Sequence, residues 1–184
     1  MLDAVWSGDE KKVAEMIRQD PGFNVNMDHG DGYTLFHCAC YENHRSAVIP
    51  LLLAHPDIDV NVKNKEGYTP FFSACGGRPS CAREMLKDFR VKVNEPAKNG
   101  ETPLWRAASN GSLDNIKWWI ASGREINLGK PGDVDKTDAI GVAKKRGHAG
   151  VVTLLERFKS DAAKTRSEVR KELRINGDHY CSFY

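Results

Sequence analysis

No stretch of this 184-residue sequence approaches the roughly 20 consecutive apolar residues that a membrane-spanning helix requires. The first residues, Met1-Leu2-Asp3-Ala4-Val5, lack the charged segment and the long apolar segment of a secretory signal peptide. The length fits one elongated domain. These absences lead us to expect a protein of the cytoplasm or the nucleus.

The sequence also lacks the short motifs of common catalytic chemistry. It has no glycine-rich phosphate loop, no Gly-x-Ser-x-Gly nucleophile elbow and no His-Glu-x-x-His metal-binding helix. An acid–histidine pair such as Asp28-His29 means little without a nucleophile and a pocket. We therefore predict a protein that is not an enzyme, uses no cofactor and has no small-molecule substrate.

The sequence has five cysteines and no visible signal peptide. An odd number of cysteines without a signal peptide argues against a framework of disulfide bonds. Cys38 and Cys40 suggest a metal site with His37 nearby, but residues two apart on a helix face different directions. Structural zinc sites also prefer Cys pairs spaced by two to four residues, with a matching second pair. We predict reduced thiols and no bound metal.

What the sequence does contain is a repeat. A small hydrophobic residue followed by asparagine occurs four times, ending at Asn26, Asn61, Asn94 and Asn127. The intervals are 35, 33 and 33 residues. A period of roughly 20 to 50 residues is typical of an array in which each unit stacks on its neighbours. Such an array offers a long surface.

A turn and a helix start follow each of the first three pairs. The segments are Gly32-Tyr33-Thr34, Gly67-Tyr68-Thr69 and Gly100-Glu101-Thr102. Glycine suits a turn position with positive φ, and threonine caps a helix N-terminus through its hydroxyl. Pro70 and Pro103 then suit the first helical position. These segments predict the first helix of each unit.

A second helix is predicted in each of these units, because apolar residues recur there at helical spacing. We expect it at residues 46–54, 80–88 and 112–121. Asn43 and Gly111 lie between the two helices of their units, where a left-handed residue would end the first helix.

The two ends of the array are predicted to be caps. Residues 2–7 and 9–19 are predicted to form a helix pair with no turn before it. Residues 139–146 and 148–158 are predicted to form a second helix-loop-helix pair at the far end of the array. Asp138 is the expected N-cap of the third of these helices. Terminal units must present one polar face to water, so divergence is expected there.

These features together resemble the ankyrin repeat. The resemblance lies in the succession Gly-x-Thr-Pro-Leu-(His)-x-Ala-Ala, a helix with a Leu-Leu-like end, and a closing Val-Asn such as Asp59-Val60-Asn61 or Lys92-Val93-Asn94. It covers residues 1–158, and the combined motif is highly specific. It implies an all-α solenoid of helix-loop-helix units joined by turn or hairpin fingers.

The resemblance has local departures. Leu35 stands in place of the usual proline, and Phe72 and Trp105 replace a histidine that His37 keeps. That histidine is expected to brace a turn by hydrogen bonds and not to act as a base. The loop at residues 76–79 is unusual and predicts a distorted third unit.

The resemblance also divides the chain. We expect five units including two caps, then a basic helix and a flexible tail. The boundaries are residues 1–26, 27–61, 62–94, 95–127 and 128–158 for the units, 159–174 for the helix and 175–184 for the tail.

In the ankyrin fold, turn fingers and inner helices line a concave groove, which implies a monomeric module that binds a partner protein. Twelve residues carried over from the family pattern are predicted to contact that partner. They are Asp28, His29, Asp31, Tyr33, Tyr41, Lys63, Lys65, Tyr68, Lys98, Glu101, Arg106 and Asn110. Further exposed positions are expected on the same face, at Cys38, Glu42, Asn64, Ser73, Asn99 and Ser109.

Aromatic residues receive separate interpretations. Tyr33 and Tyr68 lie 35 residues apart, at the same position of two successive units, and such a shared position is called a column here. The two residues are predicted to offer aligned rings to a partner. Trp105 occupies a column that braces the next unit, so we expect it to pack. Trp119 fits the buried stripe of its helix, whereas Trp118 is expected to be partly exposed on the convex side.

Two other functions remain open at this point. The same face would also suit a regulatory inhibitor that caps an enzyme. Alternatively, residues 144–174, with ten Lys and Arg against four Asp and Glu, would suit an adaptor tethered to a membrane or to nucleic acid. A capping helix that packs through Val169 and Leu173 is the simpler interpretation, and no basic-aromatic interleaving favours nucleic acid.

The last residues carry two short patterns. Cys181 stands at the prenylation position, but Tyr184 is not a usual final residue, so lipidation is disfavoured. Ser182-Phe183-Tyr184 is similar to carboxyl-terminal peptides that PDZ domains bind by strand addition. A tail without a role is preferred over both.

Overall fold

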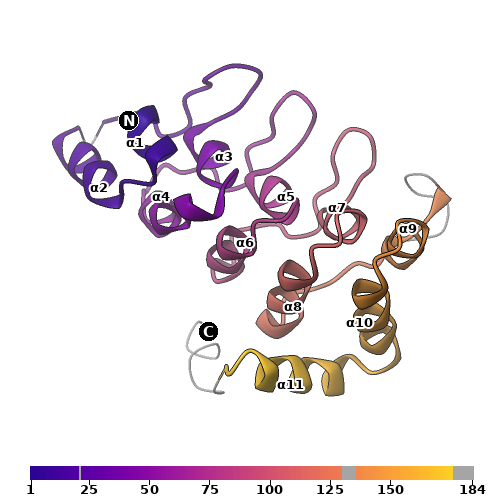
Figure 1. Ribbon diagram of the computed structural model, residues 1–184. Helices are drawn as coiled ribbons and strands as arrows, with labels where there is room; N and C mark the ends of the chain where they lie inside the picture. Colours follow the sequence, from indigo (N-terminus) through magenta and orange to yellow (C-terminus); the bar gives the residue numbers. More distant parts are fainter. Residues whose placement is uncertain (21, 130–135, 176–184) are drawn as a thin grey trace.

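The computed structural model describes residues 1–20, 22–129 and 136–175. These residues form helices and no strands, and the helices pair up along the chain (Figure 1). None of them is both long and apolar enough to cross a membrane. The helices are α1 (Leu2–Ser7), α2 (Glu10–Gln19), α3 (Leu35–Ala39), the 3₁₀ helix η1 (Asn43–Val48), α4 (Ile49–Leu53), α5 (Pro70–Cys75), α6 (Pro79–Leu86), α7 (Pro103–Ser109), α8 (Leu113–Ser122), α9 (Ala139–Lys145), α10 (Ala149–Ser160) and α11 (Ala162–Glu172).

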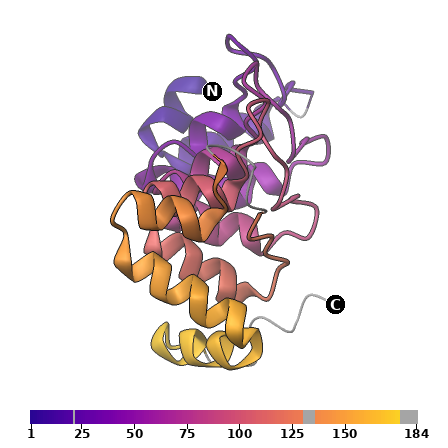
Figure 2. The ribbon, with the colours of Figure 1, turned by 90° about the vertical axis from the view of Figure 1, so that its right-hand side faces the viewer.

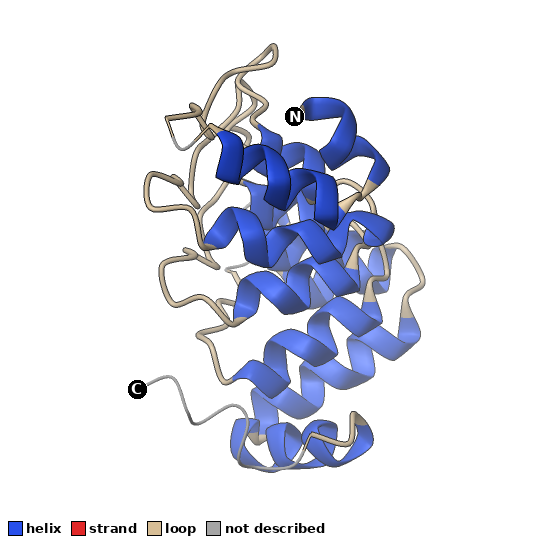
Figure 3. Ribbon diagram, turned by 90° about the vertical axis from the view of Figure 1, so that its left-hand side faces the viewer, coloured by secondary structure: helices blue, strands red, loops and turns tan. Residues whose placement is uncertain are grey.

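The helix pairs stack into two rows. The inner helices are α1, α3, α5, α7 and α9, and the outer helices are α2, η1 with α4, α6, α8 and α10. Within the inner row each helix contacts its counterpart in the next unit, and the outer row does the same. Figure 3 shows the layers of helices, with long loops gathered along one side. The predicted all-α solenoid is therefore confirmed.

Small residues let the inner helices approach one another closely. Ala39, Ala74 and Ala107 are fully buried, and their neighbours Cys40 and Cys75 are at most 1% exposed. Because no side chain beyond a methyl or a thiol separates the helices at these positions, each unit packs its backbone against the next. This packing carries the core along the whole stack.

The predicted helix caps are present. Thr69 Oγ1 accepts the N–H of Phe72 at 3.1 Å, and Thr102 Oγ1 accepts the N–H of Trp105 at 3.1 Å. Asp138 likewise caps α9. Each oxygen satisfies one of the amides that a first helical turn leaves without a partner.

The repeated asparagines join one unit to the next. Asn61 Nδ2 donates to Arg90 O at 2.9 Å, and Asn61 Oδ1 accepts the N–H of Lys92 at 2.7 Å. Asn26 makes the same two kinds of bond, to Asp57 O and from the N–H of Asp59. The side-chain amide thus replaces a backbone pairing, which explains why the period is marked by asparagine.

The third unit departs from the common pattern at residues 76–79, as predicted, because the N–H of Arg78 donates to Ala74 O, four residues back, whereas the N–H of Ser112 in the fourth unit donates to Ala107 O, five residues back. The second unit is irregular as well. The second unit has a 3₁₀ helix over Asn43–Val48 before α4 begins. Pro50 lacks the N–H that an α-helix would bond to Ser46, and its ring would clash with that carbonyl. The helix predicted at 46–54 therefore changes type within that range, whereas Pro79 simply starts α6.

The two loop residues behave differently. Gly111 has φ 67 and follows α7 in the left-handed conformation, as predicted. Asn43 does not end α3 in that conformation but begins η1, so this prediction is wrong. Cys40 and Tyr41 leave α3 by a tight turn, in which the N–H of Tyr41 donates to Cys38 O.

The C-terminal helix lies across the stack and does not continue it. The view in Figure 2 has α9, α10 and α11 one below another. The buried Val169 packs α11 on α8 and α10, and Arg166 and Arg170 donate to Ile120 O and Ala121 O at 3.1 and 2.7 Å. These arginines cap the C-terminal end of α8, where the helix dipole favours cations.

The predicted basic helix at 159–174 corresponds to α11, although residues 159 and 160 belong to α10. The predictions for Cys181 and for the tail beyond residue 175 lie outside the described residues.

Candidate functional site

Three fingers precede α3, α5 and α7 and comprise residues 27–33, 62–68 and 95–101. Each finger is closed by the same backbone hydrogen bond, so side chains at matching positions stay in register. The bonds run from His29 N–H to Tyr33 O, from Asn64 N–H to Tyr68 O and from Ala97 N–H to Glu101 O, at 2.8, 3.1 and 2.9 Å.

Neighbouring fingers also contact each other through their backbones. The N–H of Lys65 donates to Asp31 O at 2.8 Å, and the N–H of Lys98 donates to Glu66 O at 3.0 Å. Gly67 permits this approach, because a Cβ there would lie 2.8 Å from Lys98 N. The fingers therefore form one continuous edge.

Ion pairs repeat the link between fingers at the side-chain level. Lys65 Nζ lies 2.6 Å from Asp31 Oδ1, and Lys63 Nζ lies 2.8 Å from Glu95 Oε2. Hydrogen bonding to Asp31 raises the pKa of Lys65, and hydrogen bonding to Lys63 lowers the pKa of Glu95. Because solvent screens exposed ion pairs, these pairs orient the side chains more than they stabilise the fold.

None of the twelve residues predicted to contact a partner is buried. The exposed members are Asp28, Asp31, Tyr41, Lys63, Lys65, Lys98 and Asn110, and the half-buried members are His29, Tyr33, Tyr68, Glu101 and Arg106.

Three further positions expected on this face are buried instead. Asn64 is 4% exposed, because its side-chain oxygen accepts the N–H of Glu66 and of Tyr68 inside the finger. Cys38 is 8% exposed and Ser109 is 3% exposed. Side chains that follow in the chain lie against these last two segments, since Arg45 of η1 and His148 after α9 bond to the carbonyls of Cys38 and Ser109.

The two tyrosines of the fingers are anchored by the inner helices. Tyr68 stacks on Phe72 with ring centroids 4.4 Å apart and planes 7° apart. Tyr33 lies edge-on to His37 at 5.5 Å. Anchoring restricts the rings before any partner arrives, which lowers the entropy lost on contact.

His37 braces two units and is not available as a base. Its Nδ1 accepts the N–H of Thr34 at 3.2 Å, and its Nε2 lies 2.9 Å from Tyr68 O, to which it must donate. The side chain is fully buried, and this burial lowers the pKa of His37. The predicted bracing role is confirmed. Phe72 and Trp105, in the same column, are 2% and 5% exposed and pack.

The neutral state of His37 predicts a dependence of stability on pH. Because the folded pKa lies below the ordinary 6.5, the unfolded chain takes up the proton first as the pH falls. The contribution of His37 is complete above pH 6.5 and is lost as the pH falls through the folded pKa. Urea midpoints at about pH 7 and about pH 5 should therefore differ more for the unchanged protein than for His37→Phe, and equal differences would contradict the neutral brace.

The four cysteines within the described ranges offer no nucleophile. Cys38, Cys40, Cys75 and Cys81 are free and buried, and burial raises the pKa of Cys81 to about 12. Burial raises the pKa of Cys40 and Cys75 as well. A thiol with such a pKa is protonated at neutral pH and unreactive. Within the described ranges, no group of three or more His, Cys, Asp or Glu side chains is arranged to hold a metal ion.

Sequence reasoning missed two exposed aromatic side chains. Phe89 is 83% exposed and lines an open hollow of about 400 Å³, which lies between the segment that links α6 to the third finger and residues Arg124 and Glu125 after α8. Trp6 is 50% exposed at the end of α1. The spacing of 35 residues between Trp6 and Tyr41 equals that between Tyr33 and Tyr68 and was the available signal for Trp6.

A comparison with known families agrees with this architecture. A family model described as ankyrin repeats, in three copies, matches residues 1–95 and 52–129, which is more than half of the chain. Ankyrin repeats are generally protein–protein interaction modules and are typically not enzymes. On the matched residues, and on the repeated caps, fingers and helix pairs, the chain belongs to the ankyrin repeat family.

Proposed function

We propose that this protein binds a partner protein through the concave face formed by the three fingers and the inner helices. The proposal rests on a separation of roles between adjacent positions. Thr34 and Leu35 are at most 1% exposed and carry the frame, whereas Asp31 and Tyr33, immediately before them, reach the surface. In the next two units Tyr68 precedes the buried Thr69, and Glu101 reaches the surface two residues before the buried Pro103. One face therefore carries side chains that the frame does not need.

The test is a combined variant with Tyr33→Ala, Tyr68→Ala and Arg106→Ala. Tyrosine and arginine at the centre of an interface commonly contribute 2 kcal/mol or more each, so we expect capture of the partner to fall by at least tenfold. The measurement is affinity capture from native lysate with quantitative mass spectrometry. Unchanged capture would sink this assignment of the surface.

The matched control changes the opposite side. Arg83→Ala with Trp118→Ala removes an arginine and an aromatic ring from outer helices, where Arg83 lies 5.2 Å from the Trp118 ring. We expect this variant to capture the partner as the unchanged protein does. An equal loss in both variants would indicate a general defect of folding and contradict the concave face.

We further propose that the protein acts as a monomer in the cytoplasm or the nucleus. Four free cysteines support a reducing compartment. The far end of the stack supports a monomer, because charged side chains lie beside Ile140 in an open hollow on α9 and α10, among them the ion pair Lys144–Glu156 at 2.6 Å. A polar end unit does not bury apolar surface against a second copy.

A further inference from the structure

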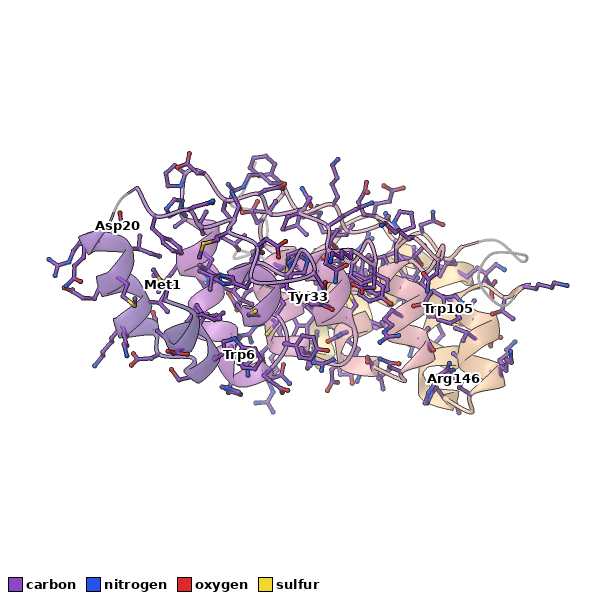
Figure 4. All side chains as sticks on the ribbon, turned by 90° about the horizontal axis from the view of Figure 1, so that it is seen from above. Met1, Trp6, Asp20, Tyr33, Trp105 and Arg146 are labelled. Atoms are coloured by element: carbon purple, nitrogen blue, oxygen red, sulfur yellow. The ribbon has the colours of Figure 1, made fainter. Side chains whose placement is uncertain are left out.

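The tryptophan at the joint between the fourth and fifth units occupies the column of a histidine that bonds two units directly. His37 and Trp105 each lie three residues after the N-cap threonine of their helix. From this position His37 Nε2 donates to Tyr68 O of the next unit at 2.9 Å. In Figure 4, seen from above, Trp105 lies toward the same end of the stack as Arg146 of the fifth unit. Trp105 is therefore placed to join the fifth unit to the fourth, since α7 and α9 pack together.

The indole nitrogen of Trp105 does not repeat the direct bond. Trp105 is 5% exposed, and its Nε1 is buried without a hydrogen-bond partner among the described residues. Thr137 is the counterpart of Tyr68 in the fifth unit, because each stands immediately before the N-cap of the next inner helix. Thr137 Oγ1 is also buried and has no bonded partner within the described part of the chain. Buried polar atoms are normally hydrogen-bonded, to protein or to ordered water, so both atoms require a partner.

One small hollow lies against both side chains. Trp105 and Thr137 line it, with Thr102 and Leu128 among its other walls. The hollow leaves about 10 Å³ for the centre of a water molecule, which is roughly the least that one buried water needs. A larger ligand does not fit this volume.

The groups around the hollow suit water better than an ion. The indole N–H of Trp105 can only donate, and the hydroxyl of Thr137 can donate or accept. Thr102 Oγ1 accepts the N–H of Trp105 at 3.1 Å and retains a hydrogen that it can donate. A cation is disfavoured by the indole N–H, and an anion is disfavoured by Asp138, which also lines the hollow. These three side chains can supply about three hydrogen bonds, the usual number for a buried water.

We infer that one water molecule is bound in this hollow, where it accepts the N–H of Trp105 Nε1 and bonds to Thr137 Oγ1. The water replaces the direct bond that His37 makes to Tyr68 O, and it joins the last unit of the stack to the fourth. This inference does not depend on the proposed function, since it concerns how the end of the binding surface is held in place.

A high-resolution crystal structure of the full chain tests the site. We expect electron density for one water within hydrogen-bond distance of both Trp105 Nε1 and Thr137 Oγ1. Density for a protein carbonyl bonded directly to Trp105 Nε1, or a hollow without density, overturns the inference.

Nuclear magnetic resonance tests the same site in solution. The indole N–H of Trp105 should show a nuclear Overhauser effect to a long-lived water. Trp119 is the internal control, because its Nε1 is buried but donates directly to Glu125 O at 3.1 Å. Thr137→Val removes one bonding group of the water and keeps the indole, so the Trp105 signal to water should weaken in this variant. No signal at Trp105 in the unchanged protein, or equal signals at Trp105 and Trp119, contradicts a bound water.

A double-mutant cycle tests whether the two side chains share the water. Trp105→Phe removes the donor, and the phenyl ring of Phe72 in the same column shows that phenylalanine fits this position. The fall in urea midpoint caused by Thr137→Val should be about twofold smaller in the Trp105→Phe background than in the unchanged protein, because the two changes remove one shared link. The control is Thr153→Val, which removes a hydroxyl that donates to Ala149 O on α10, and its effect should be the same in both backgrounds. Equal effects of Thr137→Val in both backgrounds overturn the inference.

Discussion

Replacing Trp119 by alanine should destabilise this protein by about 3–5 kcal/mol, as truncation of a large buried aromatic side chain generally does. Trp119 is 1% exposed, and its ring meets Phe71 edge-on at 5.1 Å, which joins outer helix α8 to inner helix α5 of the preceding unit. Its Nε1 also donates to Glu125 O at 3.1 Å. The change therefore removes core volume and a contact between units, and the urea midpoint followed by circular dichroism should fall.

The adjacent tryptophan is the matched control. Trp118 is half-buried and contacts Arg83 at the surface, so Trp118→Ala should cost about 1 kcal/mol. Both variants lose one indole from neighbouring positions of the same helix, which makes differences in helix propensity small. Similar losses in the two variants would contradict the assignment of Trp119 to the core and Trp118 to the convex surface.

Much of the fold could be predicted because the same residue types recur at matching positions of several units. A single threonine before a helix is weak evidence, but Thr69 and Thr102 stand at matching positions before Pro70 and Pro103. Matching columns remove the ambiguity of any one unit. The second unit shows the limit, since the effect of Pro50 on a helix depends on local bonding that the columns do not describe.

The candidate site was less predictable than the frame. The family pattern places Asn64, Cys38 and Ser109 on the concave face, but their exposure depends on which side chains of the same unit or of the next unit lie over them. Arg45 and His148 come from the helix and loop that follow and bond the carbonyls of the segments that hold Cys38 and Ser109. The position of a residue in the aligned repeat indicates on which side of a unit the residue lies. It does not indicate whether a long side chain from elsewhere covers that residue.

The same reasoning explains the two exposed rings Trp6 and Tyr41. Trp6 and Tyr41 belong to units with different turns, and only the stacked structure places a cation over each ring. Both cations come from the following unit. The surface that a partner meets is therefore a property of pairs of units, and a single unit does not possess it.

Gly67→Ala is expected to have the second large effect, because it disturbs such a pair at the fingers. Gly67 has φ 82, and a Cβ would lie 2.8 Å from Lys98 N and 3.4 Å from Ala97 C, which are backbone atoms of the next finger. We expect a loss of about 2–4 kcal/mol, which combines left-handed strain with a displaced backbone. Urea unfolding measures the loss, and hydrogen exchange at the Lys98 amide should become faster, since its bond to Glu66 O is broken.

Gly147→Ala separates the two causes. Gly147 has φ 76, close to that of Gly67, but a Cβ there has no atom within 4 Å. Its substitution should therefore cost only the left-handed strain of about 1–2 kcal/mol. Equal losses at the two glycines would mean that the fingers yield freely to each other. A larger loss at Gly67, with reduced partner capture by the folded variant, would mean that the spacing between fingers is part of what the partner recognises.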